Sequence, residues 1–158
     1  MRGRIINWLT EMPLKGPLTV FGLSIALAAF FIDRLSKWWL IDVFGIAERG
    51  VVTVLPFFDL VMAWNRGISY GLFQADTALG VAILASFAIV VTAALTLWLA
   101  RIKHRLMALS IGLIIGGAIG NIYDRIVFGA VADFFSLHAY GYYWYIFNIA
   151  DIWIAFGV

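Results

Sequence analysis

Two aspartates in apolar stretches are the residues of this sequence best suited to catalysis. Asp151 lies in Tyr145–Phe156, where nearly every neighbour is apolar except Asn148, one helical turn earlier, and Asp133 lies in Val131–Phe135 with no cation beside it. An aspartate in the hydrocarbon region of a bilayer costs about 2.5–3.5 kcal/mol on insertion scales, so such a residue marks a functional site and needs a partner. We expect Asp133 and Asp151 to be partners.

Two carboxyls in one apolar site cannot both ionise cheaply, so they share a proton. One then activates a water molecule while the other donates to a substrate carbonyl, which is aspartic protease chemistry. A structural polar pair, or a path for protons or ions, would explain the same residues. A transporter, however, usually has polar residues near the midplane of several helices, whereas Ala78–Ala100 carries no charge. Residue type and spacing alone leave these alternatives open.

A second polar group contains Asn121, Asp124 and Arg125, whose i, i+3, i+4 spacing places them on one face of a helix. An aspartate beside an arginine is easily held ionised and paired. Asp124 is therefore predicted to have a structural or substrate-clamping role rather than to titrate.

The segment Gly67–Gly71 matches G-x-S-x-G, and Asp124 or Asp133 and then His138 follow in hydrolase order. A nucleophile elbow requires a strand-turn-helix on an α/β sheet, which a four-helix membrane protein does not offer, so we expect no serine triad. His138 is expected to be interfacial and His104 to be solvated. No His or Cys spacing indicates zinc.

The composition is that of a membrane protein. The chain is 64% hydrophobic, its mean hydropathy is +0.98, and 13% of its residues are charged, against about 25% in an average soluble domain. Its 158 residues fit one domain, 1–158, and the absence of cysteine excludes disulfides, thiolate metal sites and a cysteine nucleophile. Lipid and neighbouring helices must cover the apolar runs.

The predicted fold is an α-helical integral membrane protein with four transmembrane helices, at about residues 17–40, 77–101, 105–122 and 143–158. A fourth helix from Tyr145 would have about 14 residues and a length of about 21 Å, which does not span a bilayer, so we expect further residues after Val158. β-Branched and aromatic residues at 50–64 predict short strands, and we expect a small extracytoplasmic sheet at about 42–75, between helices one and two. Gly112, Gly116 and Gly120 form a ridge that lets another helix pack closely.

The distribution of basic residues predicts the orientation, because cytoplasmic loops are rich in Lys and Arg. Two clusters are assigned to the cytoplasm, which places both termini there and the polar helix ends outside. An aromatic belt is expected at the outer face, and the stretch through Trp8 is expected to be an interfacial anchor rather than a cleavable signal peptide. The basic clusters are Arg2, Arg4 and Lys15, and Arg101, Lys103 and Arg105; the belt is Trp38, Trp39, Tyr140 and Tyr142 to Tyr145.

Five sequence blocks together resemble lipoprotein signal peptidase (signal peptidase II), a family of bacterial inner-membrane aspartyl endopeptidases. The resemblance covers nearly the whole chain, with Tyr70 where Phe is commoner and Ala132 where a larger aliphatic residue is usual. The blocks are Asp33 to Lys37, Asn65 to Gly71, Gly116 to Arg125, Val131 to Phe134 and Phe147 to Asp151.

The resemblance implies that Asp133 and Asp151 are the catalytic pair and that Asp33 and Lys37 stabilise the outer end of helix one. It implies cleavage of diacylglyceryl-modified prolipoproteins just before the modified cysteine, near the extracytoplasmic face. We expect the enzyme to act in membrane lipid as a monomer, without metal, organic cofactor or nucleic acid. The residues that the resemblance assigns to shaping the site or binding substrate are Asn65, Gly67, Asn121, Asp124, Arg125 and Asn148.

Overall fold

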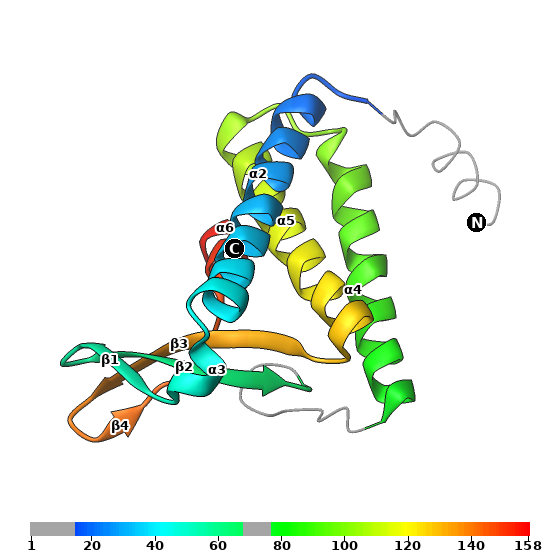
Figure 1. Ribbon diagram of the computed structural model, residues 1–158. Coiled ribbons are helices and arrows are strands. Elements are labelled where there is room, and N and C mark those ends of the chain that lie inside the picture. The colour runs from blue at the N-terminus through cyan, green and yellow to red at the C-terminus, as the bar shows by residue number, and fades with distance from the viewer. Residues whose placement is uncertain (1–14, 68–76) are drawn as a thin grey trace.

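The computed structural model describes residues 15–67 and 77–158. Within these ranges, three helical segments are long and apolar enough to cross a membrane (Figure 1). The predicted anchor through Trp8 and positions 68–71 of the G-x-S-x-G pattern lie outside the described residues. The three segments are α2 (Thr19–Trp38) continued by the π-helical η1 (Trp39–Val43), α4 (Ala78–Leu99) and α5 (Arg105–Phe128).

The helix α5 packs against both α2 and α6 (Ile149–Gly157) through its glycines. A Cβ atom at Gly112 would lie 2.5 Å from the carbonyl oxygen of Gly22 in α2, and one at Gly116 would overlap the carbonyl of Ala26. On another side of α5, a Cβ at Gly117 would overlap the carbonyl of Ala150 in α6. The close helix approach predicted from the glycine ridge is confirmed.

The ends of α5 and α6 differ from the predicted ones. The helix α5 continues to Phe128, where Gly129 ends it with a left-handed φ of 74° that glycine adopts without strain. The residues Tyr142–Tyr143, expected to begin the last helix, instead form the strand β4, and α6 starts only after the N-cap Asn148. Its nine residues give about 14 Å, less than the core of a bilayer.

A four-stranded antiparallel sheet, with the order β1-β2-β3-β4, lies across the end of the helices where α2 and α5 finish and α4 begins (Figure 1). The predicted segment between α2 and α4 supplies only two strands, β1 (Val52–Leu55) and β2 (Phe58–Asn65). The other two, β3 (Val131–Ala139) and β4, come from the connection between α5 and α6. The expectation that the whole sheet lies between the first two helices was therefore wrong.

The sequence of β3 does not alternate between apolar and polar residues, because the first four residues of the strand are all buried. Ala132 and Phe134 pack into one core cluster with Leu40 of η1 and Ile46 of α3 (Ile46–Arg49). Asp133, between Ala132 and Phe134, points to the opposite face of the strand. Burial on both faces hides the period of two that identifies a half-buried strand.

Candidate active site

The strand β3 positions the first of the two aspartates. Asp133 pairs with Ala63 of β2, and its neighbours Ala132 and Phe134 face the core beneath α3. Alternation along the strand then directs Asp133 to the other face, where its exposed fraction is 1%. A carboxyl so enclosed requires polar partners.

The second aspartate lies in the first turn of α6. Asn148 and Asp151 form a capping box: the backbone N–H of Asp151 donates to Asn148 Oδ1 at 3.0 Å, and the backbone N–H of Asn148 donates to Asp151 Oδ2 at 3.3 Å. The positive end of the helix dipole also favours a carboxylate there. The capping box thus helps to orient Asp151 from within its own helix.

Three asparagine side chains surround the two carboxyls. Asn148 donates through Nδ2 to Asp133 Oδ1 at 2.6 Å, and Asn65 donates to Asp133 Oδ2 at 3.0 Å. Asn121 donates to Asp151 Oδ1 at 2.9 Å and accepts a hydrogen bond of 3.2 Å from Asn148. One network therefore joins the two aspartates, which come from a strand and a helix.

Burial and, to a smaller extent, the nearby charge of Asp151 raise the pKa of Asp133 from its ordinary value to about 7. The hydrogen bonds from Asn65 and Asn148 act in the opposite sense, since they favour the ionised form. Asp133 therefore holds its proton far above the pH at which an exposed aspartate loses it.

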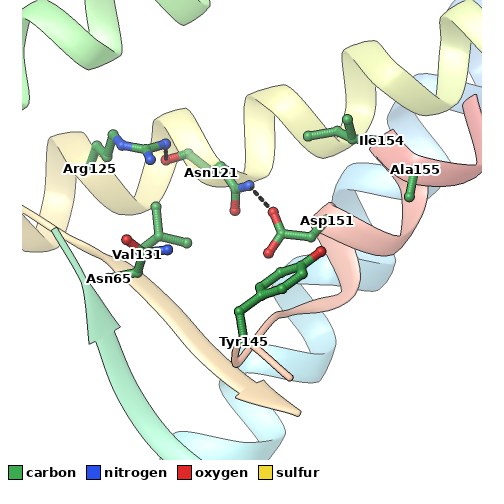
Figure 2. A pocket seen from close by; sticks show the side chains of 8 residues that line it. All are labelled: Asn65, Asn121, Arg125, Val131, Tyr145, Asp151, Ile154 and Ala155. Carbon is green, nitrogen blue, oxygen red and sulfur yellow. Dashed lines mark hydrogen bonds between the residues drawn. The ribbon is translucent and has the colours of Figure 1, made fainter. Parts of the chain in front are cut away.

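Asp151 borders a cavity of about 280 Å³ between α5, α6 and the sheet. Figure 2 shows its carboxyl directed toward Asn121, with Tyr145 beside it. A second cavity of about 250 Å³, lined mostly by apolar side chains, shares Tyr145, Asp151 and Ala155 with the first. The first cavity is lined by Asn65, Asn121, Arg125, Val131, Tyr145, Asp151, Ile154 and Ala155.

Arg125 holds the backbone near the cavity. Its Nη2 donates to the carbonyl of Gly67 at 2.8 Å and its Nη1 to the carbonyl of Asn121 at 3.5 Å. The guanidinium thereby ties α5 to the segment that follows β2. The same cation lies close enough to Asp133 and Asp151 to interact electrostatically with both.

Asp124 belongs to a separate group of charges on the α2 side of α5. Its carboxylate forms ion pairs of 2.7 Å with both Arg34 and Lys37. Lys37 is 3.0 Å from Asp33, and Arg34 is 3.5 Å from it. The side chains of Asp33 and Asp124 are completely buried, so the Lys and Arg supply the compensating charge that burial demands.

Residues 25–158 match the family model described as signal peptidase (SPase) II. The chain belongs to the signal peptidase II family. It is 50% identical over 141 residues to the lipoprotein signal peptidase of Nitrobacter hamburgensis, covering 87% of this chain and 86% of the relative. It is 49% identical, with the same coverages, to the lipoprotein signal peptidase of Rhodopseudomonas palustris.

The fold is similar to two solved structures described as bacterial membrane enzymes. One has a TM-score of 0.76 and 25% sequence identity, covering 90% of this chain and 85% of the other. The second has a TM-score of 0.73 at the same identity, covering 90% of both chains. The resemblance to signal peptidase II recognised in the sequence is confirmed, and the chain is a bacterial membrane protein.

Within this signal peptidase II chain, the residues selected from the sequence fall into two groups. One group is connected by hydrogen bonds next to the cavity, and the other is the charge group behind α5. The first contains Asn65, Asn121, Arg125 and Asp151, which line the cavity, with Asp133, Asn148 and Gly67 bound to them; the second contains Asp33, Lys37 and Asp124. Asp124 was expected to share a helix face with Arg125, but its ion pairs are with α2.

Sequence reasoning in this signal peptidase II chain missed one residue of each group. Arg34, which pairs with Asp124 and lies 4.6 Å from the centre of the Tyr123 ring, was not selected, although it stands between Asp33 and Lys37 in one helix. Tyr145 was assigned to the aromatic belt but lines the cavity beside Asp151.

The two histidines lie outside this site. His138 Nε2 lies 3.0 Å from a carboxylate oxygen of Asp59 in β2, rather than beside Asp124 or Asp133. Ser69 lies outside the described residues. His104 is exposed at the start of α5. Within residues 15–67 and 77–158, no three His, Cys, Asp or Glu side chains group as metal ligands would.

Proposed function

We propose that this chain is an aspartyl endopeptidase that removes the signal peptide from prolipoproteins, cutting just before a cysteine that carries diacylglycerol. Membership of the signal peptidase II family supports the peptidase activity and a prolipoprotein substrate. The observation that carries the mechanism is the network in which Asn148 contacts Asp133 and Asp151 next to a cavity.

The mechanism uses one proton shared between Asp133 and Asp151. The ionised carboxylate takes a proton from water, and the water oxygen attacks the scissile carbonyl carbon while the protonated carboxyl donates to the carbonyl oxygen. The tetrahedral diol then collapses: the proton taken from water passes to the amide nitrogen, the C–N bond breaks, and one hydroxyl proton returns to the other carboxylate. The raised pKa of Asp133 supports retention of this proton near neutral pH.

The amides and the guanidinium near the pair are suited to binding the peptide backbone of the substrate. Asn65, Asn121 and Arg125 line the first cavity but not the mostly apolar second one. Their N–H groups would hold substrate carbonyls and fix the scissile bond against the carboxyls. Such orientation supplies a large share of catalytic power.

The site is proposed to lie at the extracytoplasmic face, with both termini in the cytoplasm, the sheet resting on the outer leaflet and α6 forming part of a fourth membrane helix. In support, the start of α2 and the link between α4 and α5 lie at the end of the helices opposite the sheet (Figure 1). Lys15 precedes α2, and the link contains Arg101, Lys103 and Arg105. A substrate anchored by lipid in the outer leaflet would then meet the carboxyls without entering the bilayer further.

Residues 1–158 are taken to act as one membrane-embedded unit, as a monomer, without metal, organic cofactor or nucleic acid. The catalytic step requires only water and the two carboxyls, and the charged residues of the site are compensated by side chains of the same chain.

The function is tested in a bacterial strain that lacks its own signal peptidase II and accumulates uncleaved, lipid-modified precursor. Expression of this chain should convert the precursor to the mature lipoprotein, with the new N-terminus at the modified cysteine. A non-catalytic membrane protein would leave the precursor uncleaved. Precursor that persists although the chain is present and folded in the membrane would refute the proposal.

A further inference from the structure

The backbone N–H groups that immediately precede the two aspartates are both bound by the charge group behind α5. Asp124 Oδ2 accepts from Ala132 at 3.2 Å, one residue before Asp133. Asp33 Oδ1 accepts from Ala150 at 3.1 Å, one residue before Asp151. Two carboxylates on different helices thus make equivalent contacts to β3 and to α6.

Lys37 connects these two contacts. Its Nζ lies 3.0 Å from Asp33 and 2.7 Å from Asp124, and the residue is only 2% exposed. A single ammonium group therefore holds together the two acceptors that hold Ala132 and Ala150. Arg34 pairs with the same two carboxylates from the partly exposed side.

The effect of this arrangement reaches the aspartates through one peptide unit each. Consecutive Cα atoms are about 3.8 Å apart and the peptide unit is planar, so fixing the N–H of Ala132 restricts the Cα position of Asp133. The same holds for Ala150 and Asp151. Close packing adds to the restriction, because a Cβ at Gly120 would lie 2.5 Å from Asp33 Oδ2 and 3.5 Å from Ala150 Cβ.

We propose that Lys37 is a positioning residue that, through Asp33 and Asp124, sets the separation and orientation of Asp133 and Asp151. The inference rests on the proposed function, in which those two aspartates are catalytic. Lys37 does not line the cavity beside Asp151, so it does not contact substrate there. Its charge acts against the burial that raises the pKa of Asp133, and its two carboxylate partners hold the backbone before each aspartate.

The expected consequence of losing the ammonium is specific to the chemical step. In Lys37→Met, which keeps the length of the side chain, two buried carboxylates remain with Arg34 alone as their cation. Their repulsion separates the two acceptors and shifts the aspartates relative to each other. A displacement of about 1 Å in a catalytic group costs about 100-fold in rate, so kcat should fall by about 100-fold while KM changes little.

The experiment measures kcat and KM of the full chain in proteoliposomes with a synthetic lipid-modified precursor peptide. Arg34→Gln is the matched control, since it removes a charge from the same group but leaves Lys37 joining the two carboxylates; we expect about a fivefold loss at most. Lys37→Arg should recover at least about tenfold of the loss, because a guanidinium can contact two carboxylates.

Equal losses of kcat in Lys37→Met and Arg34→Gln, a change in KM alone, or no recovery in Lys37→Arg would overturn the positioning role. If Lys37→Met does not fold, Asp33→Asn and Asp33→Leu provide the test, since only Asn retains an acceptor for Ala150. We then expect the kcat of Asp33→Asn to be at least about tenfold higher than that of Asp33→Leu. Equal kcat values in the two variants would contradict the positioning role.

Asp133→Asn and Asp151→Asn, assayed alongside, separate the two proposals. Activity retained in either would remove the proposed catalytic pair and the positioning role with it. If both aspartate variants lose activity but Lys37→Met and Arg34→Gln lose kcat equally, the catalytic pair stands and only the positioning role is refuted.

Discussion

The side-chain amide of Asn148 donates a hydrogen bond of 2.6 Å to Asp133, although Asn148 is the N-cap of the helix that carries Asp151. One asparagine therefore begins α6 with its oxygen and binds the carboxyl on β3 with its nitrogen. Helix formation and the pairing of the two aspartates depend on the same side chain.

These two roles of Asn148 are separable by substitution. Asn148→Ser keeps an oxygen to cap α6 but loses the donor to Asp133, whereas Asn148→Ala loses both. We expect cleavage to fall about 10- to 100-fold in both, since a hydrogen bond to a charged group contributes about 1.5–3 kcal/mol. Thermal unfolding in detergent should show that the free energy of unfolding of Asn148→Ala is about 1 kcal/mol lower than that of Asn148→Ser. Wild-type activity in the Ser variant would contradict the role of the amide.

The raised pKa of Asp133 predicts loss of activity on the alkaline side. As the pH rises past about 7, the pair loses its shared proton and kcat should fall. The measurement is a pH–rate profile in proteoliposomes between about pH 5 and 9. A kcat that stays constant well above pH 7 would contradict a shared proton on this pair.

The same pKa shift links stability to pH. Between the ordinary value of 3.8 and about 7, the folded chain binds more protons at Asp133 than the unfolded chain does. The free energy of unfolding should therefore decrease as the pH rises through this window, and Asp133→Asn should remove that part of the slope. Unfolding measured across the window in both proteins checks the sign, and a steeper slope in Asp133→Asn would contradict it.

Arg125 is predicted to act on the segment after β2 and on substrate binding. Arg125→Gln loses the ionic donor to the carbonyl of Gly67, so kcat/KM should fall by about 10- to 100-fold, mainly through KM. Arg66→Gln, at the exposed residue next to Asn65, is the control and should have little effect. Similar losses in both variants would indicate a general charge effect instead.

Gly117 is predicted to be intolerant of any side chain, because a Cβ there would overlap the carbonyl of Ala150. Gly117→Ala should push α6 from α5, cost about 1–3 kcal/mol of stability and lower activity by displacing Asp151. Ile119→Val, on the exposed side of the same helix, should change stability by no more than about 0.5 kcal/mol. Equal stability of Gly117→Ala and wild type would contradict this prediction, because it would show that α6 can move away from α5 without a loss of stability.

The long helices and the two aspartates followed from the sequence because each depends on composition over a short window. The runs in α2, α4 and α5 are apolar over a bilayer length, and Asp133 and Asp151 are carboxyls in apolar surroundings. That Asn148 lies near Asp151 also followed from helical spacing. Its bond to Asp133 did not, since that contact joins elements that only the tertiary fold brings together.

Two features could not be predicted for different physical reasons. The strand β3 is buried on both faces at its start, so its sequence has no alternation, and its partner β2 lies far away along the chain. The partners of Asp124 depend on how α5 is rotated against α2, and adjacency to Arg125 in sequence does not determine that rotation. The spacing of Asp33, Arg34 and Lys37 on one helix was the available signal.

The most direct test of the proposed pair is single-turnover cleavage of a lipid-modified precursor by purified Asp133→Asn and Asp151→Asn in proteoliposomes. Both variants keep the size of the side chain, and we predict that each folds, binds precursor and cleaves about 10³-fold more slowly than wild type. Cleavage within about tenfold of wild type by either variant would contradict catalysis by a shared-proton aspartate pair.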